Sequence, residues 1–254
     1  MIPTTDLDSG VAHSARNATT RLPADLAQFF SFVRSPTRRY PRREKPGRVF
    51  RTIAVLFALN AFFTLAVSVP TYLLLQSLIG LTSRSSIEPV AFLVLSVTVG
   101  PLVEEALFRA GLRSARWTMC GMPALIALYV QGWQSALAIA AVTSLALLVD
   151  AATRYRMRPG DYATLRWRRG RAFIERYPLI VHGYALAFAM IHIVNYVYDP
   201  TIGWHAGLVV FAVSSQLVLG LMLSFVRLRF GLQHAIVAHG VWNALVHMVD
   251  AVIG

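Results

Sequence analysis

Long apolar runs, each about as long as a lipid bilayer is thick, constrain this chain more than any other feature. An α-helix needs about 20 predominantly apolar residues to cross the hydrocarbon core. Runs of this kind occupy residues 52–81, 89–112, 178–197, 204–226 and 233–253. Charged residues make up only 14% of the sequence, against about 25% in soluble domains. Because helices satisfy their own backbone hydrogen bonds in hydrocarbon, we predict an all-α polytopic transmembrane bundle.

The remaining apolar stretch, residues 119–149, decides the number of crossings. Gly132 divides it into a short piece and a longer one, and arginines lie both before and after it. If both flanks are cytoplasmic, the stretch crosses an even number of times, as a tight hairpin or re-entrant pair. This predicts about seven spans, with six or eight also compatible, in a plasma (inner) membrane with the amino terminus cytoplasmic.

Basic residues are concentrated in two places. Of 24 lysines and arginines, ten fall between Arg16 and Arg51, and eight between Arg154 and Arg176. Basic clusters beside apolar spans follow the positive-inside rule, which explains the net charge of +12 without a nucleic-acid partner. Attraction to the anionic headgroups of membrane lipids is compatible with the same clusters.

These features divide the chain into regions. Residues 1–51 are predicted to be a basic polar cytoplasmic tail, and residues 52–254 a transmembrane domain with a basic cytoplasmic loop at 150–177. Within the tail, residues 24–33 could form a short amphipathic helix on the membrane surface or belong to a disordered segment. The single cysteine, Cys120, excludes an intrachain disulfide and a metal cluster built from several thiolates.

Two adjacent carboxylates, Glu104 and Glu105, lie inside the apolar run at 89–112. An acid at bilayer depth costs roughly 3 kcal/mol on insertion scales, so it is a candidate functional residue. Glu105 and Arg109 are separated by four residues and can pair on one helix face, whereas Glu104 is turned about 100° away. Arg109 would keep Glu105 ionised and leave Glu104 to exchange a proton, as a general base does. A purely structural ion pair is the alternative.

The dipeptide Gly100-Pro101 precedes the two acids and should loosen this helix. Backbone carbonyls released in this way are tolerated at membrane depth only where they face protein or a water-filled cavity.

Two later apolar runs carry further polar residues at helical spacing. Phe188 and His192 are four residues apart, as are His239 and Asn243. Side chains with this spacing share a helix face. A histidine and an asparagine facing one groove can hold a water molecule, a metal ion or a developing oxyanion. Each residue taken alone could equally make an interhelical hydrogen bond.

Taken in order, these motifs resemble the CAAX protease and bacteriocin-processing (CPBP or Abi) family of intramembrane endopeptidases. The resemblance covers roughly residues 89–254. The stretches that carry it are Val103-Glu104-Glu105-Ala106-Leu107-Phe108-Arg109, Phe188-Ala189-Met190-Ile191-His192 and His239-Gly240-Val241-Trp242-Asn243.

The resemblance implies a hydrolase that cleaves a peptide bond in a membrane-associated peptide or protein tail. Glu104 would be the catalytic base, supported by Glu105 and Arg109. His192 would hold water or substrate, while His239 and Asn243 would position the water or stabilise the oxyanion.

The cofactor requirement stays open at this level. The family has been described both as metal-dependent and as metal-independent glutamate proteases. The zinc-helix pattern His-Glu-x-x-His is absent from the sequence. Glu104, His192 and His239 could still form an open zinc site. No cofactor is favoured, and zinc is the alternative.

Two other functions fit parts of the pattern. A catalytically silent scaffold of the same fold is one, since fold does not imply function. A proton-coupled transporter that uses Glu104, Glu105 and His192 as a relay is the other.

Overall fold

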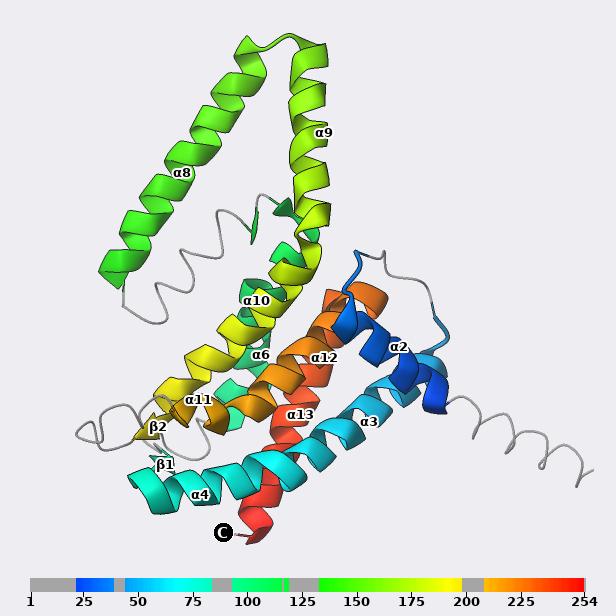
Figure 1. Ribbon diagram of the computed structural model, residues 1–254, viewed down its shortest axis with the longest axis vertical. Helices are drawn as coiled ribbons and strands as arrows, with labels where there is room; N and C mark the ends of the chain where they lie inside the picture. Colours follow the sequence, from blue (N-terminus) through cyan, green and yellow to red (C-terminus); the bar gives the residue numbers. More distant parts are fainter. Residues whose placement is uncertain are drawn as a thin grey trace, which may run out of the picture.

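The structure is a computed structural model that describes residues 22–38, 44–83, 93–115, 117–118, 133–197 and 208–253. Within these ranges the chain is helical, apart from a two-residue ladder and short connections (Figure 1). The helices are α2 (Leu22–Arg34), α3 (Pro46–Phe63), η1 (Thr64–Ser68), α4 (Val69–Ile79), η2 (Leu95–Val99), α6 (Gly100–Arg109), η3 (Gly111–Arg113), α8 (Trp133–Arg156), α9 (Pro159–Glu175), α10 (Tyr177–Ile191), η5 (His192–Asn195), α11 (Val209–Ala212), α12 (Ser214–Phe230) and α13 (Leu232–Ile253). The all-α prediction is confirmed.

Two helical stretches of the described chain are long and apolar enough to cross a membrane. They are Pro46–Ile79 and Tyr177–Asn195. The first combines α3, η1 and α4 and corresponds to the predicted run at 52–81. The second combines α10 and η5 and corresponds to the run at 178–197. The count of seven spans and the cytoplasmic amino terminus stay predictions. Residues 119–132, which include Cys120, and residues 198–207 lie outside the described residues.

Proline shapes both helices that contain a π-helical turn. The π-helix η1 ends two residues before Pro70, and η2 ends two residues before Pro101. The proline ring clashes with the carbonyl four residues earlier and supplies no N–H of its own. Widening the preceding turn to a π-helix relieves this clash, and π-turns of this kind are frequent at functional sites. The predicted loosening before the two acids is therefore present as η2.

The core forms where α10, α12 and α6 meet. Gly220 of α12 allows a close approach to α10, since a Cβ atom there would lie 3.3 Å from the Ala185 backbone and 3.2 Å from the Phe188 ring. Small residues of this kind let helices pack tightly within membranes. The approach fixes Phe188, which is fully buried, at the centre of the main apolar cluster.

The predicted amphipathic segment at 24–33 is a helix, α2, and it packs against α3 and α12. Its Phe29 and Phe32 are buried in the main apolar cluster. Asp25 is also buried and pairs with Arg51 of α3 at 3.0 Å. The helix is therefore part of the folded core.

The basic segment at 150–177 is not a loop, in contrast to the prediction. Helix α8 continues to Arg156 and α9 covers Pro159–Glu175, so the two form a helical hairpin that projects from the bundle (Figure 1). The apolar and basic parts of α8 form one helix because no glycine or proline interrupts residues 133–156. The prediction had placed the helix end where the polarity changes.

A minimal β-ladder joins two distant parts of the chain. β1 (Thr82–Ser83) pairs antiparallel with β2 (Tyr196–Val197). α4 ends just before β1 at Gly80, whose φ of 62° is the left-handed conformation that glycine adopts without strain. The ladder ties the end of α4 to the end of η5, next to His192.

Candidate active site

Three elements bring the predicted catalytic side chains together. α6 carries Glu104, Glu105 and Arg109, the α10–η5 junction carries His192, and α13 carries His239. α6 packs against both α10 and α13. The three motifs identified in the sequence therefore meet at one place, although up to 135 positions separate their residues.

Glu105 is the buried centre of a charged cluster. Its Oε1 lies 3.0 Å from Nη1 of Arg109 and 3.0 Å from Nδ1 of His239. The side chains of Glu105 and Arg109 are 0% and 1% exposed. The predicted pairing of Glu105 with Arg109 is present. Glu105 also holds His239, which the spacing of the motifs did not reveal.

Phe188 provides an aromatic surface beneath this cluster. The guanidinium carbon of Arg109 lies 4.0 Å from the centre of its ring, within the range of a cation–π contact. The rings of His192 and His239 contact the same ring edge-on, at 4.8 and 5.6 Å between centroids. Phe188 therefore fixes the positions of one cation and two imidazoles at once. These contacts give a physical reason for a phenylalanine at this position of the motif.

Glu104 faces the two histidines from the other side. Its Oε2 lies 3.8 Å from Nε2 of His239 and 4.0 Å from Nε2 of His192. These separations exceed a direct hydrogen bond. Oε2 is buried and has no hydrogen-bond partner among the described residues. The carboxylate side chain is 18% exposed, so Glu104 is the accessible acid of the pair and Glu105 the enclosed one.

The partners of each Nδ1 determine how the rings present Nε2. His192 Nδ1 donates to the Phe188 carbonyl at 2.7 Å, since a carbonyl only accepts. His239 Nδ1 donates to Glu105 at 3.0 Å for the same reason. In a neutral ring with a protonated Nδ1, Nε2 is an acceptor. Three acceptor atoms thus face one another, and a molecule that donates hydrogen bonds fits among them.

Asn243 lies one turn beyond His239 on α13, and the structure gives it a backbone partner. Its Nδ2 donates to the carbonyl of Ser96 in η2 at 2.7 Å. Pro101 lacks the N–H that a π-helical turn would direct at this carbonyl, because the turn bonds residues five apart. Asn243 therefore satisfies a carbonyl released by the proline. An amide has two N–H donors, and this bond uses one of them.

Gly240 allows α13 to approach η2 closely. A Cβ atom at this position would lie 2.6 Å from the carbonyl oxygen of Val97, which is shorter than real Cβ contacts. Val97 lies four residues before Pro101, so its carbonyl is the one the proline ring pushes away from the helix. The sequence reasoning missed Ser96, Val97 and Gly240 as parts of the site. The Gly100-Pro101 dipeptide was the signal that released carbonyls would need partners.

A zinc ion held by Glu104, His192 and His239 would set the distances between their ligand atoms. A tetrahedral zinc ion with bonds of about 2.1 Å holds neighbouring ligand atoms about 3.4 Å apart. Glu104 Oε2 lies 3.8 and 4.0 Å from the two Nε2 atoms, which is wider. No group of three metal-binding side chains was found in the part of the chain that is described. The observed separations lie between the zinc value of about 3.4 Å and the roughly 4.4 Å that one water molecule sets between two acceptors at hydrogen-bond distances of about 2.8 Å, so the spacing alone favours neither occupant.

Comparison with known protein families gives a match. A family model described as type II CAAX prenyl endopeptidase Rce1-like matches residues 86–245, more than half of the chain. The matched region contains α6, α10 and the part of α13 that bears His239 and Asn243. Searches of curated proteins and of solved structures found no match.

This match assigns the chain to a class of proteins, the membrane-embedded peptidases of helical fold. Within that class, the chain belongs to the Rce1-like family of type II CAAX prenyl endopeptidases. The resemblance seen in the three sequence motifs is thereby confirmed.

Proposed function

We propose that the chain is an intramembrane endopeptidase in which Glu104 activates the water that hydrolyses a peptide bond. The observation that carries the proposal is the buried Oε2 of Glu104, which has no hydrogen-bond partner among the described residues and lies within 4.0 Å of two histidine Nε2 atoms. A carboxylate oxygen that has lost its bulk water costs free energy unless something donates to it. A bound water molecule supplies that donor.

The contacts of the charged cluster support different roles for Glu105 and Glu104. Glu105 is held by Arg109 and His239, so its charge is compensated and it acts as a support. Glu104 has no basic partner closer than 3.8 Å among the described residues, so it can take up a proton. General base catalysis needs a carboxylate that is free to accept a proton directly from the attacking water.

The proposed reaction follows from these positions. The water donates one hydrogen bond to Glu104 and one to a histidine Nε2. Glu104 removes a proton as the water oxygen forms a bond with the carbonyl carbon of the substrate, whose oxygen becomes an oxyanion. When the oxyanion collapses, the carbon–nitrogen bond breaks, and protonated Glu104 delivers its proton to the departing amine. The carboxylate is restored and no redox step is involved.

Asn243 and the histidines complete the proposed site. The amide N–H of Asn243 that does not bond to Ser96 would stabilise the oxyanion, and each such donor is worth about 10²–10³ in rate. His239 would orient the water through Nε2, with Glu105 holding its ring. His192 would hold the water or the substrate from the other side.

The substrate proposed is a peptide or protein tail associated with the membrane, with a prenylated CAAX tail as the first choice. This choice rests on the printed description of the family, a CAAX prenyl endopeptidase. The proposed location is the plasma (inner) membrane, with several spans in contact with lipid and the amino terminus on the cytoplasmic side.

A cleavage assay tests the proposal. The purified protein in liposomes is given a pool of membrane-anchored peptides that includes prenylated tails, and wild type is compared with Glu104→Gln. The control is Glu175→Gln, which alters an exposed glutamate on α9 that pairs with Arg171. We expect cleavage by wild type and by the control, and none by Glu104→Gln.

Each assay is repeated with a metal chelator. Activity that survives chelation agrees with a metal-free mechanism, and activity lost to the chelator and restored by zinc contradicts it. Equal cleavage by wild type and Glu104→Gln would overturn the role of Glu104. Proton-coupled flux without cleavage would favour the transporter, and neither activity would favour the silent scaffold.

A further inference from the structure

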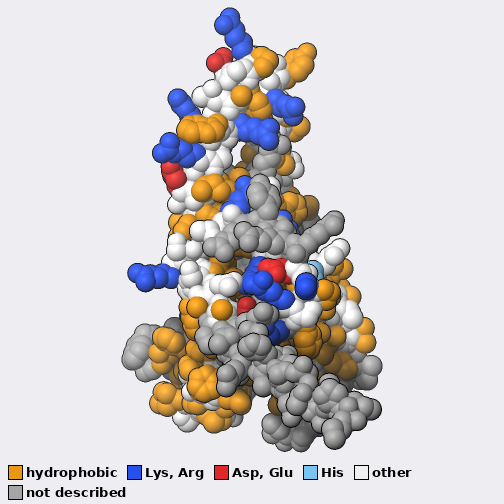
Figure 2. Space-filling model, turned by 90° about the vertical axis from the view of Figure 1, so that its right-hand side faces the viewer, with side chains coloured by type: hydrophobic (Ala, Val, Ile, Leu, Met, Phe, Trp, Pro, Cys, Tyr) orange, Lys and Arg blue, Asp and Glu red, His pale blue; other side chains and the backbone are white. Residues whose placement is uncertain are grey.

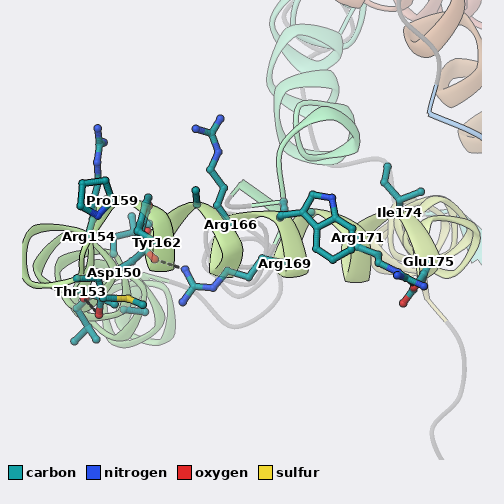
Figure 3. A pocket seen from close by; sticks show the side chains of 18 of the residues that line it. Asp150, Thr153, Arg154, Pro159, Tyr162, Arg166, Arg169, Arg171, Ile174 and Glu175 are labelled. Carbon is teal, nitrogen blue, oxygen red and sulfur yellow. Dashed lines mark hydrogen bonds and ion pairs between the residues drawn. The ribbon is translucent and has the colours of Figure 1, made fainter.

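A cleft between α8 and α9 lies apart from the proposed active site. Its walls come from the last turns of α8 and most of α9 (Figure 3). The apolar lining includes Leu147 and Val149 on α8 and Trp167 and Ile174 on α9. An ion pair between Arg169 and Asp150 links the two helices across the cleft (Figure 3). This ion pair therefore ties the two arms of the hairpin together at the cleft.

Arginine side chains give the cleft its charge. Arg154, Arg166 and Arg171 line it, and all three are exposed. Arg171 pairs with Glu175 at 2.7 Å, and Arg154 lies 6.0 Å from the centre of the Tyr162 ring. Arg166 extends from α9 and makes no ion pair with any described residue (Figure 3). In the space-filling view, basic side chains gather at the end of the molecule formed by this hairpin (Figure 2).

The α8 wall is suited to hydrocarbon rather than water. Leu147 and Val149, which line the cleft, are 41% and 57% exposed. An exposed apolar stripe of this kind indicates contact with lipid or a partner. Arg154 follows Val149 by about 7.5 Å along the helix at 1.5 Å per residue. Arg154 therefore lies about one and a half helical turns beyond the last apolar residue of the α8 wall.

Trp167 adds a large aromatic side chain to the cleft. Trp167 is 63% exposed although it lines the cleft. Tryptophan is enriched where hydrocarbon meets headgroups, because its ring is amphipathic. The cleft thus offers an apolar wall, an amphipathic aromatic side chain and positive charge, the three kinds of contact that the acyl chain, glycerol region and phosphate of a phospholipid need.

We propose that the α8–α9 cleft binds one anionic phospholipid, with its headgroup phosphate at Arg154 and Arg166 and an acyl chain along α8. Guanidinium groups bind phosphate with paired N–H donors, which gives the site geometric as well as electrostatic selectivity. General attraction of arginines to an anionic membrane would not depend on which arginines face the cleft. Binding in the cleft does depend on which arginines line it. Helices α8 and α9 carry arginines that line the cleft and arginines that do not, so the two sets can be compared.

The test uses the fluorescence of the purified full chain in neutral detergent. It is titrated with phosphatidylglycerol carrying brominated acyl chains, with brominated phosphatidylcholine, and with inorganic phosphate as a competitor. Bromine quenches a tryptophan that it contacts, and Trp167→Phe identifies the part of the signal that comes from the cleft. The expected result is quenching of Trp167 by phosphatidylglycerol at a concentration at least about ten times lower than by phosphatidylcholine, since each arginine near an anionic lipid is worth about five-fold in affinity.

Two variants of equal charge separate a site from a general field. Arg154→Gln with Arg166→Gln removes two charges that line the cleft, and Arg156→Gln with Arg168→Gln removes two exposed charges of the same helices that do not line it. The first should raise the quenching midpoint about ten-fold or more, and the second less than about three-fold, because salt screens distant charges within about 8 Å. Equal effects of the two pairs would overturn the proposal. So would equal quenching by the two lipids, or displacement by inorganic phosphate, which would indicate a site for the free anion.

Discussion

The side-chain amide of Asn243 donates to the backbone carbonyl of Ser96 at 2.7 Å, and this bond joins α13 to the π-helical turn before the two acids. The carbonyl needs a partner because Pro101 has no N–H to offer it. A proline in one helix and an asparagine in another are thus complementary parts of one contact. The contact sets how α13, with His239, faces Glu104 and Glu105.

Removing the amide should weaken both the fold and the activity. In Asn243→Ala the part-buried Ser96 carbonyl loses its partner, and the cost should lie towards the lower end of the roughly 1–3 kcal/mol of a fully buried acceptor without a hydrogen bond. We expect a lower temperature of thermal unfolding in detergent and a loss of cleavage larger than the unfolded fraction explains. Asn243→Asp tests the donor directly, since a carboxylate cannot donate to the carbonyl. An aspartate variant with full activity would contradict the need for an N–H at this position.

Gly240→Ala should separate α13 from η2. The added methyl would lie 2.6 Å from the Val97 carbonyl, so one helix must move. Overpacking of this kind costs typically about 1–3 kcal/mol. Gly183→Ala in α10 is the matched control, because a Cβ atom there meets nothing within 4 Å. The unfolding temperature and the cleavage rate should fall in the first variant and stay near wild type in the second.

Pro101→Ala should restore regular helical hydrogen bonding before the acids and thereby disturb the site. An N–H at position 101 can bond the Val97 carbonyl, which removes the cause of the π-turn and draws this carbonyl away from α13. Cleavage should fall while circular dichroism shows undiminished helix content. Pro70→Ala alters the corresponding proline after η1 and should leave cleavage intact. Similar losses in both variants would show that proline matters for general packing and not for the site.

The contributions of the buried Glu105–Arg109 pair to stability and to cleavage should be separable by mutation. Glu105→Gln leaves the enclosed guanidinium uncompensated, and breaking a buried pair costs about 3–5 kcal/mol. The double variant Glu105→Leu with Arg109→Met removes both charges and should recover much of this stability. Cleavage should stay low in the double variant, because His239 then lacks the acceptor for its Nδ1. An active double variant would make the pair purely structural.

Local sequence patterns carried the prediction of the helices and of the pairing within each motif. The apolar runs predict helices because hydrocarbon leaves the backbone no other partner. The spacing of four residues places Glu105 beside Arg109 whatever surrounds the helix, and the structure has this pair at 3.0 Å. The Gly100-Pro101 dipeptide likewise predicted a disturbed turn, which η2 is. The basic segment at 150–177 was wrongly predicted as a loop, because a change from apolar to charged residues ends a membrane span without ending a helix.

Which side chains meet across helices was decided by the tertiary structure. Hydropathy indicates that a helix crosses, but not its rotation about its own axis or its depth relative to a neighbour. Those two quantities place His239 between the two acids, with Nδ1 on Glu105 and Nε2 toward Glu104. Rotation and depth also bring Asn243 to the Ser96 carbonyl. This carbonyl lacks a helical partner because of Pro101, which lies 142 positions before Asn243 in the sequence. The sequence alone therefore determined which residues are polar within apolar helices, and helix packing around Phe188, Gly220 and Gly240 determined what each of them contacts.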